Sequence, residues 1–181
     1  VQGDNLLALK ALLPYYAGQV KCIYIDPPYN TGNESWVYND NVNSPDIQAW
    51  LGLAQAGQYH EAWQKLIEEN PMPAIHGRVC YHPCEDGCNR AFVDSSVSIH
   101  AVERFLGDKA IEEGWKVQFR PKPGGKRVLV VGAGPSGLSA AYHLARMGHA
   151  VEVFEAGPMA GGMMHFGIPA YRLPRNIIAA E

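Results

Sequence analysis

The stretch that decides the fold reads RVLVVGAGPSGLSAAYHLARMGHAVEVFE, residues 127–155. Its first five residues form the aliphatic run that is typical of a buried parallel strand. A glycine-rich turn follows at once, then an apolar helix that ends near Gly148, and then a second strand over residues 150–154. Strand, turn, helix and strand in this order predict the first β-α-β unit of a doubly wound, Rossmann-like parallel sheet.

The glycine-rich turn has the GxGxxG spacing of a dinucleotide-binding site. Gly132 permits the tight turn, Gly134 lets the backbone approach a pyrophosphate, and Gly137 lets the helix pack closely on the strand. The N-terminus of the helix offers free N–H groups and the positive end of its dipole to the phosphates. Glu155, about 20 residues further on, is placed to accept hydrogen bonds from both hydroxyls of an adenosine ribose. An acidic side chain at this position disfavours a cofactor with a 2′-phosphate. The residues predicted to bind the cofactor at this turn are Gly132, Gly134, Pro135, Ser136, Gly137 and Glu155.

A second glycine pair, Gly161-Gly162-Met163, follows the second predicted strand. Together with the first turn it resembles the FAD-binding start of flavoproteins that contain two dinucleotide-binding domains. In those proteins the second Gly-Gly element approaches the flavin dinucleotide, which implies that Gly161, Gly162 and Met163 contact FAD here. NAD and S-adenosylmethionine are the competing ligands, and this continuation favours FAD over both. Residues 167–174, GIPAYRLP, narrow the resemblance to the glutamate synthase small-chain family.

Three of the four cysteines gather in one short stretch. Cys80, Cys84 and Cys88 have three residues between neighbours. Zinc sites favour pairs of cysteines separated by two residues, so this spacing suits an iron–sulfur cluster better. The other interpretation is that the thiols stay free or bind zinc together with His76 or His82.

The region around these cysteines carries a second part of the same resemblance. Residues 70–74, 77–88 and 99–105 are similar to the small chain of glutamate synthase and to the N-terminal part of dihydropyrimidine dehydrogenase. In that family the cysteines ligate [4Fe–4S] clusters that relay electrons between the flavin and the site of a partner. The position that matches Glu103 supplies a non-cysteine ligand in the dehydrogenase.

The resemblance thus implies that Cys80, Cys84, Cys88 and Glu103 are metal ligands. The family has further cysteines just before the helix that begins near Asp46, whereas residues 39–45 contain none here, so the ligand set is incomplete. His100 lies on the helix of Glu103, and we expect it to be packed or exposed rather than a ligand. Ser98 is predicted to cap the N-terminus of that helix.

The first 45 residues carry a different motif, Asp26-Pro27-Pro28-Tyr29. With its flanking residues it resembles the adenine-specific DNA methyltransferases of type III restriction–modification systems. The resemblance implies that Asp26 and the Pro27 carbonyl hold the N6 hydrogens of a flipped adenine, that Tyr29 stacks on the ring, and that S-adenosylmethionine is the methyl donor. The other interpretation is a proline-terminated strand without a catalytic role. Because no donor-binding or target-recognition segment follows, we expect these residues to be vestigial.

Composition limits the remaining possibilities. The chain has 181 residues and a net charge of -3, with 15 Lys and Arg against 18 Asp and Glu. Without basic clusters it is a poor candidate for holding nucleic acid by charge alone. No apolar run is long enough for a membrane span, and four cysteines do not make a disulfide scaffold. We expect a soluble, cytoplasmic chain.

We therefore predict a mixed α/β chain in three parts. Residues 1–45 form a methyltransferase-like stub of one helix and one strand, 46–120 a helical iron–sulfur domain, and 121–181 a truncated Rossmann-type domain that binds FAD or NAD(P). The change of resemblance near residues 43–50 leads to the hypothesis of a chimera, natural or from sequence assembly.

The function implied by the larger resemblance is that of an NAD(P)H-dependent flavoprotein oxidoreductase fragment of the glutamate synthase small-chain type. It would pass electrons between FAD and iron–sulfur clusters, with NADPH as the reductant and a large oxidoreductase subunit as the partner. Since Glu181 falls early in the FAD domain, we expect the chain to be too short for turnover. The alternatives are a fragment of an N6-adenine DNA methyltransferase, with DNA as its partner, and a remnant without activity.

Overall fold

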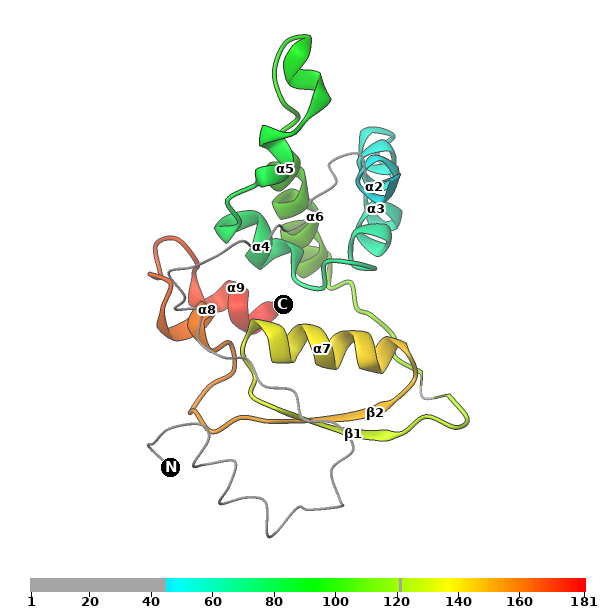
Figure 1. Ribbon diagram of the computed structural model, residues 1–181, viewed down its shortest axis with the longest axis vertical. Helices are drawn as coiled ribbons and strands as arrows, with labels where there is room; N and C mark the ends of the chain where they lie inside the picture. Colours follow the sequence, from blue (N-terminus) through cyan, green and yellow to red (C-terminus); the bar gives the residue numbers. More distant parts are fainter. Residues whose placement is uncertain (1–44, 121) are drawn as a thin grey trace.

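The computed structural model describes residues 45–120 and 122–181, which form a helical part and a β-α-β part (Figure 1). The helical part consists of α2 (Pro45–Gln55), α3 (Tyr59–Leu66), α4 (Pro73–Val79), α5 (Pro83–Asp86), the 3-10 helix η1 (Asn89–Phe92) and α6 (Ile99–Glu113). The second part consists of β1 (Arg127–Val131), α7 (Pro135–Arg146), β2 (Ala150–Phe154), α8 (Met163–Phe166) and α9 (Arg175–Ala180). Both the helical middle region and the β-α-β unit predicted from the sequence are present.

The core of the helical part lies where α2, α3 and α6 meet. Each helix places apolar residues at intervals of three and four, so that one stripe faces the other two helices. Trp50 comes from α2, Trp63 from α3 and Leu106 from α6, and all three are buried. Burial of these stripes, rather than intrinsic helix propensity, stabilises helices as short as these.

Helices α4 and α6 cross with their backbones in contact, and two glycines make this possible. A Cβ atom on Gly107 of α6 would lie 2.2 Å from the backbone nitrogen of Ala74 in α4. A Cβ atom on Gly77 of α4 would lie 2.6 Å from the backbone nitrogen of Arg104 in α6. No side chain fits at either point, so the sequence fixes the closest approach of the two helices.

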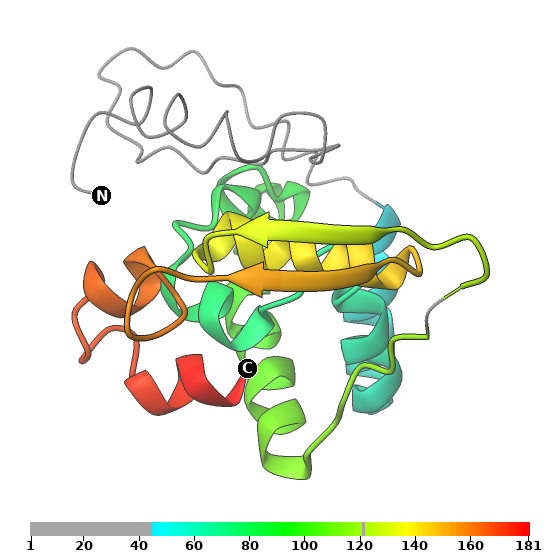
Figure 2. The ribbon, with the colours of Figure 1, turned by 90° about the horizontal axis from the view of Figure 1, so that it is seen from below.

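Strands β1 and β2 pair in parallel, with Arg127 opposite Ala150 and Val131 opposite Phe154. Helix α7 covers one face of this pair (Figure 2). The other face has no covering layer among the described residues, and Val131 and Phe154 are exposed there. The prediction of a buried strand at residues 127–131 is therefore correct for Val130 but wrong for Val131.

The two parts pack against each other where α4 meets α8 and α9, and where α7 meets the end of α3. Met72 and Ile75 form a buried cluster with Met164 and Leu173 of the second part. The hydroxyl of Tyr142 in α7 donates a hydrogen bond of 2.7 Å to the carbonyl of Ile67. These contacts hold the glycine-rich turn close to the N-terminal side of α4.

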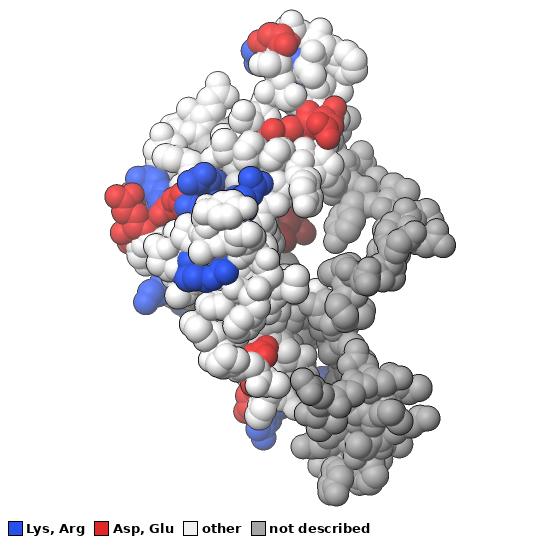
Figure 3. Space-filling model, turned by 90° about the vertical axis from the view of Figure 1, so that its left-hand side faces the viewer, with Lys and Arg blue, Asp and Glu red and all other residues white. Residues whose placement is uncertain are grey.

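Two surface properties bear on the expectations from composition. Within the described ranges, no helix combines the length and apolar character that a membrane span requires. On the face shown in Figure 3, Lys and Arg side chains are scattered and acidic side chains lie among them. This face therefore lacks the continuous basic surface on which nucleic-acid binding by charge depends.

Candidate dinucleotide and metal sites

The glycine-rich turn joins β1 to α7 in the geometry that the sequence predicts. Gly132 has a φ of 102°, a conformation that side chains rarely adopt. Gly134 is the N-cap residue of α7 and Pro135 is its first residue, where a missing N–H costs nothing. A Cβ atom on Gly137 would lie 2.0 Å from the carbonyl oxygen of Gly132, so only glycine lets α7 pack on the turn. The N-terminus of α7 is thereby presented at the carboxyl end of β1.

Glu155 follows β2 and its carboxylate reaches this turn. One oxygen, Oε2, accepts a hydrogen bond of 2.7 Å from the backbone N–H of Ala133, and Oε1 accepts one of 2.7 Å from Gly157. These backbone hydrogen bonds, that of Ala133 first, lower the pKa of Glu155 and keep it ionised. The side chain is exposed, so a ribose beside the turn can reach the carboxylate.

The second glycine pair lies directly against the first turn. The backbone N–H of Gly161 donates a hydrogen bond of 2.7 Å to the carbonyl of Ala133. A Cβ atom on Gly162 would lie 2.9 Å from the Cα atom of Gly134, and the φ of Gly162 is 48°. Met163 begins α8 and is exposed. The structure thus brings the cofactor-binding residues predicted from two separate stretches of sequence to one place.

An apolar cavity of about 250 Å³ lies beside this place, between the two parts of the chain. Met72 and Ile75 of the helical part form one side, and Leu138, Tyr142 and Met164 of the second part line the other. This cavity was not predictable from the sequence, since its walls come from elements that are far apart in the chain.

The three clustered cysteines lie on the loop and short helix that follow α4. Cys80 is exposed, whereas Cys84 and Cys88 are partly buried, and all three are free thiols. Burial, assisted by nearby Cys80 and carboxylates, raises the pKa of Cys84 to about 11. Hydrogen bonds from backbone groups of Val97 and Arg90 lower the pKa of Cys88. A bound metal cation would favour the thiolate at all three positions.

Glu103 lies on α6 and its carboxyl group is buried near these thiols. The side-chain amide of Asn70 donates a hydrogen bond to Oε1 of Glu103, and burial raises the pKa of Glu103 to about 7. The oxygen of Asn70 in turn accepts a hydrogen bond from the backbone N–H of Met72. This role of Asn70 could not be predicted from the sequence, because it depends on how the start of α4 packs against α6.

Three thiols and one buried carboxylate equal in number the four ligands of a cubane cluster. In the described part of the chain, the ligand atoms of these four groups do not all lie within 4.8 Å of one another, as the ligands of a single metal ion would. A four-iron cluster does not require that, because each ligand binds a different iron atom. The donors therefore fit a [4Fe–4S] cluster in chemistry, whereas the further cysteines that the family has before α2 are absent from residues 39–45.

Comparison with known proteins defines the class of both parts. Residues 41–115 match the family model of dihydropyrimidine dehydrogenase domain II, 4Fe-4S cluster, and residues 130–169 match that of the NAD(P)-binding Rossmann-like domain. The chain therefore combines an iron–sulfur domain of the dihydropyrimidine dehydrogenase type with an NAD(P)-binding domain. This agrees with an iron–sulfur and dinucleotide-binding resemblance over about residues 46–181, while the preference for FAD at the turn stays a prediction.

The most informative relatives are subunits of NADPH-linked oxidoreductases. The glutamate synthase [NADPH] small chain of Bacillus subtilis is 41% identical over 133 residues, which cover 73% of this chain and 27% of the relative. The NADP(+)-dependent formate dehydrogenase subunit beta of Moorella thermoacetica is 39% identical over 158 residues, covering 75% of this chain and 22% of the relative. The chain thus spans about a quarter of the length of these relatives.

The methyltransferase part of the prediction receives no such support. Asp26, Pro27 and Tyr29 lie outside the described residues, and neither family model reaches them. The glutamate synthase [NADPH] small chain of Escherichia coli is 36% identical over 168 residues, covering 91% of this chain and 35% of the relative. Residues 46–181 alone cannot provide that coverage, so the match extends into the first 45 residues. The role of this segment in methyl transfer stays a prediction from its motif.

Proposed function

We propose that this chain is part of an NAD(P)H-dependent flavoprotein oxidoreductase of the glutamate synthase small-chain type. FAD lies on the glycine-rich turn at residues 132–137, and a [4Fe–4S] cluster is held by Cys80, Cys84, Cys88 and Glu103. One observation carries the proposal: the carboxylate of Glu155 and the Gly161-Gly162 pair meet at the N-terminus of α7.

The turn supplies what a dinucleotide pyrophosphate needs. Gly162 lets the second glycine pair pack directly against Gly134, so that backbone from both loops lines the place of the phosphates. The N-terminus of α7 places N–H groups and a positive dipole end beside them. Glu155 accepts hydrogen bonds from the ribose hydroxyls, exchanging its bond to the Ala133 N–H for ligand contacts. Bound flavin accepts a hydride and releases electrons one at a time.

FAD is favoured over NAD(P) at this turn by the second glycine pair. Gly161 is hydrogen-bonded to Ala133 of the first turn, so both glycine elements face the same ligand. The cavity between α4 and α7 adjoins them, and most of its lining is apolar, with the carboxyl group of Glu181 as the exception. Such a lining suits a flat aromatic ring better than a charged group.

The cysteine loop provides the site from which electrons leave. Cys80 is exposed beside the partly buried Cys84 and Cys88, so a group bound there is close to the surface. The relatives are named as small chains or beta subunits, and this supports a larger oxidoreductase subunit as the electron acceptor or donor.

The proposal is tested by preparing the chain without oxygen and measuring its flavin and iron content and its visible absorption. We expect bound FAD and about four iron atoms per chain. Replacement of Glu155 with alanine removes charge-assisted hydrogen bonds to the ribose, which are worth about 1.5 to 3 kcal/mol. We therefore expect FAD affinity to fall about 10- to 100-fold.

Glu152 offers a matched control for this measurement. It lies on β2, three residues before Glu155, and its exposed carboxylate pairs only with Arg127, at 3.2 Å. Glu152→Ala is expected to leave FAD affinity unchanged. A colourless preparation without flavin or iron, or equal effects of the two substitutions, would contradict the proposal. Methyl transfer from labelled S-adenosylmethionine to adenine in DNA would favour the alternative function instead.

A further inference from the structure

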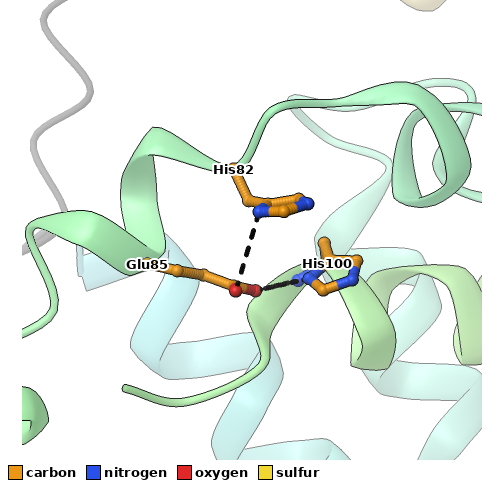
Figure 4. Close-up of side chains that lie close together, drawn as sticks. All are labelled: His82, Glu85 and His100. Atoms are coloured by element: carbon orange, nitrogen blue, oxygen red, sulfur yellow. Dashed lines mark hydrogen bonds and ion pairs between the residues drawn. The ribbon is translucent and has the colours of Figure 1, made fainter. Parts of the chain in front are cut away.

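A cluster of side chains with nitrogen and oxygen donors lies beside the thiols of the cysteine loop, and the backbone N–H of His82 donates a hydrogen bond of 3.3 Å to Sγ of Cys80. His82, Glu85 and His100 each offer one ligand atom, and these atoms lie within 4.8 Å of one another (Figure 4). His82 immediately precedes α5, Glu85 is on α5, and His100 is at the start of α6. It is the only such group of three or more in the part of the chain that the structure describes.

Glu85 is held in place by α6. Its Oε1 accepts a hydrogen bond of 2.9 Å from the backbone N–H of His100 and lies 2.7 Å from Nδ1 of the same residue. Glu85 thereby takes over the capping role predicted for Ser98, whose side chain makes no capping hydrogen bond.

The second carboxylate oxygen, Oε2, faces His82. It lies 3.8 Å from Nδ1 of His82, which is beyond hydrogen-bond distance and leaves room for adjustment around an ion. The rings of His82 and His100 are stacked, with centroids 4.0 Å apart and planes 23° from parallel. This stacking fixes the two rings relative to each other on one side of the Glu85 carboxylate.

The backbone of His82 is also unusual. Its φ of 46° and ψ of 53° place it in the left-handed region, and within the described ranges it is the only residue other than glycine with a positive φ. This conformation costs free energy and is concentrated at functional sites. Here it turns the His82 side chain back over Glu85 (Figure 4).

We propose that His82, Glu85 and His100 bind one divalent transition-metal ion, for which Zn²⁺ is the best-suited physiological candidate. Two imidazole nitrogens and one carboxylate form a donor set that zinc accepts, with a fourth position open to water. The ion is distinct from the iron–sulfur cluster because its ligands are nitrogen and oxygen rather than sulfur. It ties α5, which carries Cys84, to the N-terminus of α6.

The test uses the full chain, prepared free of metal, and Co²⁺ as a spectroscopic probe for Zn²⁺. Cobalt bound to thiolates shows intense charge-transfer absorption, whereas cobalt bound to nitrogen and oxygen shows only weak d–d bands. Besides any cobalt that the thiols of the cysteine loop bind with charge-transfer absorption, we expect one further Co²⁺ per chain that shows weak bands alone and is displaced by Zn²⁺. If all bound cobalt shows thiolate charge transfer, or if none binds, the proposal is overturned.

Two substitutions assign the ligands while preserving the fold. Glu85→Gln keeps an oxygen that can accept the His100 N–H but loses the charge, and His82→Asn keeps a residue that tolerates the left-handed conformation. Loss of a residue that supports a metal ligand lowers metal affinity about 10- to 100-fold, and loss of a ligand should lower it at least as much. We therefore expect each of the two substitutions to lower Co²⁺ affinity at least about tenfold. Asp86→Asn changes the neighbouring, exposed acid and is the matched control. Cobalt affinity that is the same in Glu85→Gln as in Asp86→Asn would show that Glu85 only caps α6.

Discussion

Replacing Gly107 with alanine tests whether the backbone contact between α4 and α6 holds the helical part together. The new Cβ atom would lie 2.2 Å from the backbone nitrogen of Ala74, where ordinary contact begins at 3.4 Å. The two helices must therefore separate by about 1.2 Å at their closest point. Ala74 and Leu106 beside the contact are fully buried, so the movement opens gaps in the core.

Two opposing effects set the size of the change. Alanine in place of glycine within a helix contributes about 0.5 to 1 kcal/mol of stability. Overpacking costs about 1 to 3 kcal/mol in a well-packed core, and the upper part of that range applies because the obstacle is backbone. We expect Gly107→Ala to lower the free energy of unfolding by about 1 to 2 kcal/mol.

Gly52 provides the control, since it is exposed on α2 and a Cβ atom there meets nothing within 4 Å. Gly52→Ala should raise the free energy of unfolding by about 0.5 to 1 kcal/mol through helix propensity alone. Urea denaturation followed by circular dichroism measures both variants. If Gly107→Ala is as stable as Gly52→Ala, the two helices do not approach as closely as the structure shows, and the reasoning is refuted.

Three further outcomes follow from other contacts. Gly137→Ala places a Cβ atom 2.0 Å from the carbonyl oxygen of Gly132, so we expect FAD to be lost from the purified chain while α2, α3 and α6 keep their helical signal. Tyr142→Phe removes the hydrogen bond to the Ile67 carbonyl, and the free energy of unfolding should fall by about 1 kcal/mol in urea titrations. Burial raises the pKa of Glu181 from 4.5 to about 7, so the folded chain binds more protons than the unfolded chain between these values. Stability should therefore decline as pH rises from 4.5 through 7, and Glu181→Gln should abolish this part of the decline in melting temperature.

The β-α-β unit and its glycines were predictable because each of these residues is required by residues close to it in the chain. Gly132 must have a positive φ, Gly137 must leave room for the carbonyl five residues earlier, and Glu155 must follow the second strand. None of these depends on how distant elements pack. The helices of the middle region were predictable for the same reason, since the apolar spacing of each helix is read within its own residues.

Contacts between distant elements were not predictable in this way. Ser98 is the N-cap residue of α6 as predicted, yet its side chain makes no capping hydrogen bond, and Glu85 from α5 accepts the N–H of His100 instead. The expectation that His100 is packed or exposed missed its contact with Glu85, because nothing in the sequence shows that α5 meets the start of α6. The exposure of Val131 likewise depends on which layers cover the sheet, which strand composition does not reveal.

Helix α4 connects the two candidate sites. Ile75 in its middle lines the cavity beside the glycine pair, the side chain of Glu181 accepts hydrogen bonds from the N–H groups of Ala74 and Ile75, and Cys80 follows its last turn. Seven residues of α-helix span about 10 Å, so the cavity and the first cysteine are less than one short helix apart. Because α4 is locked against α6 by Gly107, this separation is fixed by packed backbone rather than by a loop. A flavin in the cavity and a cluster on the cysteine loop would then keep a constant distance, which electron transfer requires since its rate falls steeply with separation.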